Sequence, residues 1–247
     1  MTSRNVAEPP LAVVTGASGA LGSAIHARLT ANGWKVVATY RSRPPATGTG
    51  AESLWVRFDT DAPNPGAELG AAVEASGGAL RAVFACIGAP STKRPVAATP
   101  AEEFEQVHRA NVLSLVHTWH AVAEPARAGR ASLLAVGSDA GRAARAGNGP
   151  YTAAKAALEA LVVTLAREEQ QHGVRANLVA PSLIDSPLAH HVMQLKGVNN
   201  PDTYYQGLPW GRPLAMAEVA QVCLDVATAE HWRYATGQVY PLIAAAI

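Results

Sequence analysis

The sequence predicts an α/β fold in which a doubly wound parallel β-sheet is covered by helices on both faces. Short apolar segments of strand character alternate with helical segments along most of the 247 residues. Apolar residues make up 49% of the chain and charged residues 16%, a balance typical of a well-buried core. Because no Pro-rich, Gly-rich or charged stretch divides the chain, we expect one domain over residues 1–247.

Charge and composition limit the partners. A formal net charge of +1 provides no basic field for nucleic acid. Residues 1–10 form a polar tail without the apolar core of a secretory signal, and no segment is apolar over the roughly eighteen residues that a membrane span needs. We therefore expect a cytoplasmic protein that binds neither nucleic acid nor membrane. Cys86 and Cys223 are too few for a disulfide framework or a zinc site, so we expect both to be buried and no metal to be bound.

A glycine-rich loop follows the first predicted strand. Residues 11–14 are a short apolar run, residues 15–22 read TGASGALG, and residues 23–29 have helical spacing. Glycines let the backbone approach a pyrophosphate, and the new helix points its free N–H groups at the anion. This order predicts a Rossmann-type dinucleotide site, although many glycine loops are plain turns. The candidate cofactor contacts in this loop are Gly16, Ser18, Gly19, Leu21 and Gly22.

The second predicted strand covers residues 35–39 and ends in Tyr40 and Arg41. In dinucleotide folds this strand tip meets the adenosine ribose, where an acidic residue favours NAD and an arginine accommodates the 2′-phosphate of NADP. The tip contains no Asp or Glu, so Arg41, with Arg43 as a second candidate, favours NADP over NAD. The alternative is that both arginines are solvated in a loop.

Three further segments follow the same alternation. Residues 54–58 are predicted to be the third strand, and Asp59 at its end would accept a hydrogen bond from the adenine amino group or cap a helix. Residues 81–88 are predicted to be the fourth strand, running into a turn at Gly88. A long helix is expected over residues 101–123, with Asn111 among apolar neighbours.

The fifth and sixth strands are predicted over residues 130–136 and 174–181. Ligands of parallel sheets bind outside the carboxyl ends of the strands, where the segments that follow each strand meet. We expect one active site at this edge. The positions that follow strands include Gly16, Arg41, Gly88, Ser138 and Ser182.

Tyr151 and Lys155 lie four residues apart on a helix predicted to run to about residue 171, so they share one helix face. A nearby ammonium favours phenolate, so we expect the pKa of Tyr151 to fall from about 10 toward neutrality. Such a phenol can give a proton to a carbonyl oxygen or take one from an alcohol. Alone, the same pair occurs by chance on many surface helices.

Together these motifs resemble the classical short-chain dehydrogenase/reductase family along nearly the whole chain. Residues 15–22 are similar to its cofactor loop, Tyr151-x-x-x-Lys155 to its catalytic signature, and Ser138 and Asn111 to its serine and its helix asparagine. Residues 133–187 are most similar to β-ketoacyl carrier-protein reductases and polyketide ketoreductases.

The resemblance implies a role for each of these residues. Tyr151 would be the general acid, Lys155 would lower its pKa and hold the nicotinamide ribose, and Ser138 would hydrogen-bond the substrate oxygen. Asn111 would position a water that relays protons to Lys155. The expected activity is NADPH-dependent reduction of a ketone, of β-ketoacyl or polyketide type. The alternatives are an NAD-dependent alcohol dehydrogenase and a nucleotide-binding scaffold without turnover.

The sequence departs from the family pattern at three places. Residues 85–88 read ACIG where Asn-Asn-Ala-Gly is usual, Pro181-Ser182 replaces Pro-Gly beside the nicotinamide, and the ending over residues 240–247 lacks Gly-Gly. These changes affect the expected cofactor geometry and subunit contacts. None removes a proton-transfer group.

A substrate lid is expected over residues 183–213, because long loops in compact α/β domains tend to be functional. Its side chains suit a bulky or aromatic substrate: His190, His191, Met193, Leu195, Tyr204, Tyr205 and Trp210. Neither histidine is expected to bind metal. Four basic residues could meet a carrier protein or a coenzyme A thioester: Lys93, Arg94, Arg142 and Arg145. The resemblance also implies a homotetramer or homodimer, with alanine-rich helix faces in contact.

Overall fold

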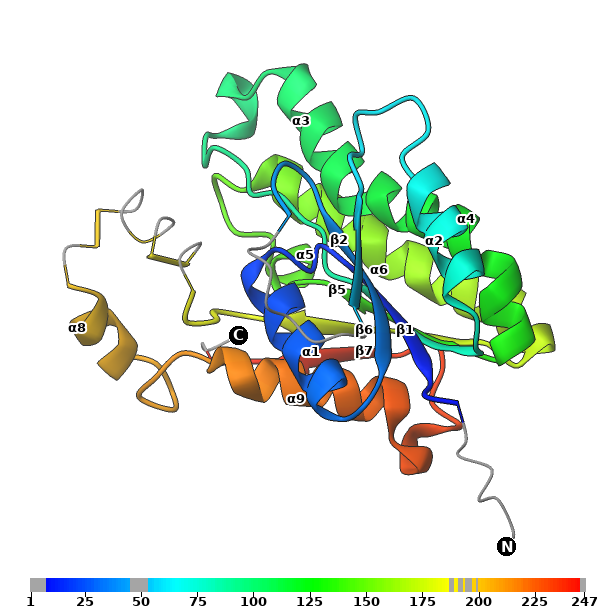
Figure 1. The fold of residues 1–247 in the computed structure, drawn as a ribbon. Coiled ribbons are helices and arrows are strands. Elements are labelled where there is room, and N and C mark those ends of the chain that lie inside the picture. Colours follow the sequence, from blue (N-terminus) through cyan, green and yellow to red (C-terminus); the bar gives the residue numbers. More distant parts are fainter. Residues whose placement is uncertain are drawn as a thin grey trace, which may run out of the picture.

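The structure, a computed structural model, describes residues 8–44, 53–186, 189–190, 193, 197–198 and 200–244. Within these residues the chain forms one seven-stranded sheet of order β3-β2-β1-β4-β5-β6-β7, in which every neighbouring pair is parallel (Figure 1). The predicted fold class is therefore confirmed. The strands are β1 Leu11–Thr15, β2 Lys35–Tyr40, β3 Ser53–Arg57, β4 Leu80–Ala85, β5 Ser132–Val136, β6 Arg175–Pro181 and β7 Val239–Leu242.

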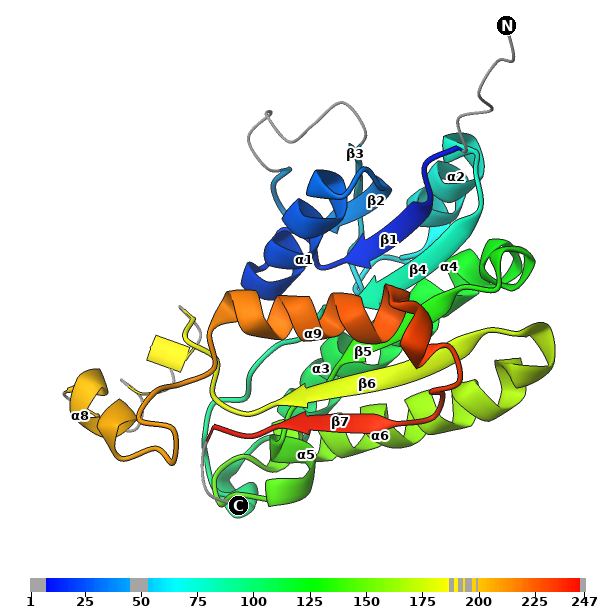
Figure 2. The same ribbon diagram turned by 90° about the horizontal axis from the view of Figure 1, so that it is seen from below.

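Helices cover both faces of the sheet. Helices α1 (Ala20–Ala31) and α9 (Met216–Thr228) pack together on one face, and α2 (Ala67–Ser76), α4 (Ser114–Gly129) and α6 (Gly149–Glu169) cover the other (Figures 1 and 2). The shorter helical segments are α3 Ala101–His108, α5 Ala140–Ala143, α8 Pro201–Gln206, η1 Val96–Ala98, η2 Arg109–Leu113, η3 Gln170–His172 and η4 Glu230–Trp232.

Successive strand residues enter opposite cores, as the alternation of side chains along a strand requires. Val13 and Leu133 join the cluster under α4 and α6, whereas Val14 and Leu134 join the cluster under α1 and α9. All four side chains are fully buried. A sheet buried on both faces explains why the central strands read as continuous apolar runs.

Helices α2 and α9 and strand β7 lie outside the predicted set, as do the short helical segments α5, α8, η1 and η4. Strand β7 is a partly buried strand of four residues that contains Pro241, and a proline in the sequence argues against a strand in the interior of a sheet. It pairs with β6 at the edge of the sheet, where a proline is tolerated. No helix in the described part of the chain is long and apolar enough to cross a membrane.

The predicted helix over residues 101–123 is interrupted. Its middle, η2, is a π-helical turn between α3 and α4, and α4 continues to Gly129. In η2 the side-chain nitrogen Nδ2 of Asn111 donates to the carbonyl oxygen of Val107 (2.8 Å) and to that of Ala89 (2.9 Å). The side chain of Asn111 therefore joins the helix to the loop after β4, and a π-turn of this kind often marks a functional site.

Candidate active site

The glycine loop has the shape that a pyrophosphate site requires. Gly16 has φ +72°, and its N–H donates to the Thr39 hydroxyl (3.0 Å). A Cβ at Gly22 would lie 2.2 Å from the carbonyl oxygen of Gly16, so a larger residue cannot stand there. Ser18 and Gly19 are exposed, and no side chain caps the N-terminus of α1. The loop with its open helix end therefore fits a dinucleotide phosphate.

The tip of β2 lies in a network of exposed ion pairs. Arg41 follows Tyr40 and contacts Asp61 (Nη2–Oδ2, 2.9 Å) and Asp59 (Nε–Oδ1, 3.5 Å). Asp59 also pairs with Arg57 (3.1 Å), and Asp61 with Arg109 (3.6 Å). Arg41 is thus near the predicted position, but a cofactor phosphate would compete with two carboxylates for it. Asp61 was missed from the sequence because it stands beyond the strand end.

Ser138, Tyr151 and Lys155 meet at the carboxyl edge of β5. Tyr151 lies in the first turn of α6, and its phenol hydrogen-bonds with Ser138. The Lys155 ammonium lies 5.6 Å from the centre of the Tyr151 ring and donates to the carbonyl oxygen of Val136 (3.0 Å). The backbone N–H of Ala140 donates to the Ser138 hydroxyl (3.2 Å), which fixes the serine. The Ser138 hydroxyl and the Tyr151 phenol are therefore close enough to contact the same ligand atom, and the Lys155 ammonium lies beside the phenol ring.

The expected fall in the pKa of Tyr151 is wrong for the protein alone. Burial raises the pKa of Tyr151, the hydrogen bond with Ser138 lowers it by less, and the negative charge of Asp139 raises it further. Burial also lowers the pKa of Lys155 to about 8, because an ammonium loses its hydration there. The phenol is therefore protonated at neutral pH, and the pKa of the Lys155 ammonium lies close to neutral pH.

Asn111 and Gly88 border the ammonium of Lys155 on its other side. A Cβ placed on Gly88 would lie 2.9 Å from Asn111 Oδ1 and 3.4 Å from Lys155 Nζ, so both atoms stand over this glycine. Asn111 Oδ1 is buried and has no hydrogen-bond partner among the described residues. A buried acceptor next to an ammonium suits a bridging water. Residues of η2 and α6 thus meet the segments that follow β4 and β5.

The departures from the family pattern leave the sheet edge intact. Cys86 donates its backbone N–H to the carbonyl oxygen of Thr15 (3.0 Å), so the main chain joins β1 and β4 there. Cys223 is buried and Cys86 partly buried, and both are free thiols. Ser182 accepts a hydrogen bond from the N–H of Ala244 on its hydroxyl (2.7 Å), which ties the chain after β6 to the chain after β7. Pro181 ends β6 immediately before it.

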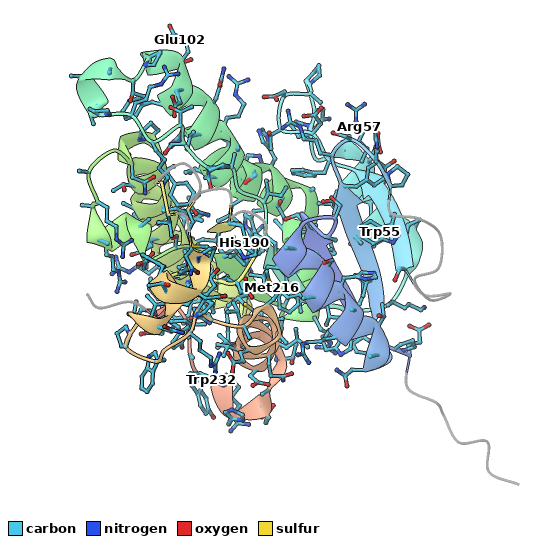
Figure 3. All side chains as sticks on the ribbon, turned by 90° about the vertical axis from the view of Figure 1, so that its left-hand side faces the viewer. Trp55, Arg57, Glu102, His190, Met216 and Trp232 are labelled. Atoms are coloured by element: carbon cyan, nitrogen blue, oxygen red, sulfur yellow. The ribbon has the colours of Figure 1, made fainter. Side chains whose placement is uncertain are left out.

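The predicted lid is described only in part. Nε2 of His190 lies 3.0 Å from Oδ1 of Asp185, and the Trp210 indole donates to the carbonyl oxygen of Ile243 (3.2 Å). Figure 3 shows His190 on one side of α1 and Arg57, the last residue of β3, on the other side in this view. His191 and Leu195 lie outside the described residues. In the described part of the chain no group of His, Cys, Asp or Glu could hold a metal ion.

Charged residues other than Lys155 also lie near Tyr151. Asp139 follows Ser138 directly and pairs with Arg145 (2.6 Å), while Lys93 lies 5.8 Å from the centre of the Tyr151 ring. Of the four basic residues singled out from the sequence, Lys93 and Arg145 thus lie near the site. Arg142 instead pairs with Glu159 (2.9 Å).

Comparison with known proteins gives the family. A family model described as "Enoyl-(Acyl carrier protein) reductase" matches residues 16–242. The chain belongs to the short-chain dehydrogenase/reductase family. Carbonyl reductase family member 4 of Danio rerio is 28% identical, over 93% of this chain and 94% of that protein. The 2,5-dichloro-2,5-cyclohexadiene-1,4-diol dehydrogenase LinX of Sphingobium indicum is 27% identical, over 94% of each.

Solved structures of the family share the fold. The crystal structure of a short-chain dehydrogenase/reductase family oxidoreductase from Burkholderia thailandensis has a TM-score of 0.81 and 27% identity, covering 94% of this chain and 90% of that chain. The protein is therefore an oxidoreductase that uses a nicotinamide cofactor, NAD or NADP, and acts on C=O or CH–OH groups. Ser138, Tyr151 and Lys155 are of residue types that can carry out the proton transfer which that chemistry needs.

Proposed function

We propose that the protein is an NADPH-dependent ketoreductase that converts a bulky ketone to a secondary alcohol. The observation that carries the proposal is the cluster of Ser138, Tyr151 and Lys155 around one point, with Tyr151 held in its protonated form. A phenol that keeps its proton at neutral pH has the proton that reduction needs, although the raised pKa by itself makes it a weaker acid. Alcohol oxidation needs phenolate, which the same environment disfavours.

The residues divide the work as follows. The nicotinamide, when bound, supplies the hydride to the carbonyl carbon. Ser138 and Tyr151 hydrogen-bond the substrate oxygen, and Tyr151 gives its proton to that oxygen as negative charge develops, so a full oxyanion never forms. Lys155 holds the nicotinamide ribose and favours the phenolate left behind. Asn111, through a water on its Oδ1, returns a proton toward Lys155 and then Tyr151.

The preference for NADP rests on Arg41. Its guanidinium stands at the tip of β2, and a 2′-phosphate would make charge-assisted hydrogen bonds with it. The nearby carboxylates of Asp59 and Asp61 reduce this advantage, so we expect a moderate preference with NADH as a weaker substitute. Asp59 would also meet the adenine amino group, with Gly88, Pro181 and Ser182 beside the nicotinamide.

Further features belong to the same proposal. One domain over residues 1–247 carries both the cofactor site and the substrate site, with a substrate lid over residues 183–213. The substrate is a ketone, free or attached to a carrier protein or coenzyme A. The protein acts in the cytoplasm in a biosynthetic reaction, as a homotetramer or homodimer.

A second candidate is an NAD-dependent alcohol dehydrogenase. The similarity to a diol dehydrogenase over 94% of the chain favours it, as do the two carboxylates beside Arg41. A scaffold without turnover is the third candidate, and the intact triad of Ser138, Tyr151 and Lys155 opposes it.

The test is a panel of aromatic ketones and β-ketoacyl thioesters incubated with NADPH or NADH, with the alcohol product measured by chromatography. We expect reduction with NADPH, and loss of most activity in Ser138→Ala without loss of cofactor binding. No alcohol from any ketone, together with alcohol oxidation by NAD at neutral pH, would favour the second candidate. No turnover in either direction would favour the scaffold.

A further inference from the structure

The loop after β4 holds Lys93 in an unusual backbone conformation. Lys93 has φ +66°, in the left-handed region that residues other than glycine rarely adopt. The residue before it is anchored: Thr92 donates its backbone N–H and its hydroxyl to the Glu103 carboxylate, each at 2.7 Å. A backbone conformation of this kind persists only where the surroundings hold it, and such residues cluster at functional sites.

Asn148 holds the Lys93 side chain. Its amide oxygen accepts hydrogen bonds from the Ser91 hydroxyl (3.1 Å) and from the Lys93 ammonium. Asn148 stands at the N-cap of α6, where an asparagine oxygen ordinarily caps the helix, yet it makes no capping bond. Both Ser91 and Asn148 are buried. The side chain that would cap α6 instead fixes the position of an ammonium.

The position is next to the reactive phenol. Lys93 Nζ lies 5.8 Å from the centre of the Tyr151 ring, comparable to the 5.6 Å of Lys155. The Lys155 side chain is buried, whereas the Lys93 side chain is half-buried. The carboxylate of Asp139, which follows Ser138 in the chain, is paired with Arg145 at 2.6 Å. Lys93 and Arg145 are cations and Asp139 is an anion, so these three side chains together carry one positive charge.

We propose that Lys93, positioned by Asn148, binds a carboxylate of the substrate, so that keto acids are reduced in preference to neutral ketones. This inference rests on the proposed function. A phosphate of coenzyme A or of a carrier-protein arm fits less well, because the whole pantetheine arm separates it from the ketone, whereas Lys93 stands beside the reacting group. A carboxylate only a few bonds from the ketone matches the short distance to Tyr151.

The test compares keto acids with their methyl esters, which keep the ketone and remove the charge. Phenylglyoxylate and 3-benzoylpropionate, each beside its methyl ester, supply two spacings between carboxylate and carbonyl. For at least one pair we expect the wild type to have a higher kcat/KM for the acid. Lys93→Met should lower the value for that acid by about 10- to 100-fold, the range for loss of a hydrogen bond between charged groups. The kcat/KM of Lys93→Met for the methyl ester should stay within a few-fold of the wild-type value.

Two variants serve as controls. Lys93→Arg keeps the charge and should keep the preference for the acid. Arg94→Met removes an adjacent exposed charge and should leave both substrates unchanged. An equal fall for acid and ester in Lys93→Met, or a wild type that prefers both esters, would overturn the proposal. Failure of every ketone, charged or neutral, would instead count against the proposed function itself.

Discussion

The two ends of the cofactor edge are built in opposite ways. At the adenosine end, Arg41 is 67% exposed and Asp61 53% exposed, and the charges pair with one another in water. At the catalytic end, Asn111 and Lys155 are almost completely buried, and Asn111 Oδ1 has no partner among the described residues. Exposed ion pairs contribute little to the stability of the fold and exchange partners readily. Buried polar groups, in contrast, strongly perturb the pKa values of their neighbours. We therefore expect cofactor selection at the first end and proton transfer at the second.

Removal of the phenol should give the largest effect. Tyr151→Phe keeps the ring and removes the proton donor, and we expect kcat for ketone reduction to fall by about 10²- to 10⁴-fold. Steady-state kinetics with NADPH measure the change, and fluorescence titration measures cofactor affinity, which should remain within a few-fold. Full activity in this variant would mean that another group donates the proton.

The catalytic end should also respond to pH. Because burial lowers the pKa of Lys155 to about 8, its ammonium loses its proton as the pH rises through that value. Reduction needs the charged form, so we expect kcat/KM to be maintained below pH 8 and to decline above it. Lys155→Met should have a much lower kcat, and a pH profile without this decline would support the assignment. An unchanged decline in that variant would assign it to another group.

The adenosine end should show a smaller, selective effect. Arg41→Ala removes the guanidinium that would contact the 2′-phosphate, so we expect the Kd for NADPH to rise about tenfold while the Kd for NADH changes little. The melting temperature should hardly move, because exposed ion pairs contribute about 0–1 kcal/mol. Equal weakening of both cofactors would remove the basis for an NADP preference.

The smallest effect is expected at the neighbouring carboxylate. Asp61→Asn keeps the shape of the side chain and removes the charge that competes with a phosphate for Arg41. We expect NADPH to bind a few-fold more tightly and NADH to be unaffected. Isothermal titration calorimetry with both cofactors is the measurement, and weaker NADPH binding would contradict the competition.

Some of these features could be predicted from the sequence and others could not, for physical reasons. Five of the first six strands contain apolar runs followed by turns, and β3 alternates apolar and polar residues, so these strands could be predicted from the sequence alone. Strand β7 was missed because its four residues include Pro241, which argues against a strand in the interior of a sheet. The π-turn at Asn111 was missed because the apolar spacing of residues 101–123 matches an ordinary helix.

The site residues follow the same rule. Ser138, Tyr151 and Lys155 could be predicted as site residues because each follows a strand or belongs to a local motif. Two further contacts join side chains that are far apart in the sequence and that only the fold brings together. They are the ion pair of Arg41 with Asp61 and the hydrogen bond from Lys93 to Asn148. The sign of the shift in the pKa of Tyr151 depends on burial, which a spacing of four residues cannot supply.

The most direct test of the central claim follows the hydride. NADPH carrying deuterium at the transferable C4 position is incubated with the enzyme and a ketone that the enzyme reduces, and the alcohol product is analysed by mass spectrometry and NMR. If carbonyl reduction occurs at the cluster of Ser138, Tyr151 and Lys155, deuterium should appear on the carbinol carbon of the wild-type product, and Tyr151→Phe should form almost none of it. An alcohol without deuterium, or equal labelled product from both proteins, would contradict the account.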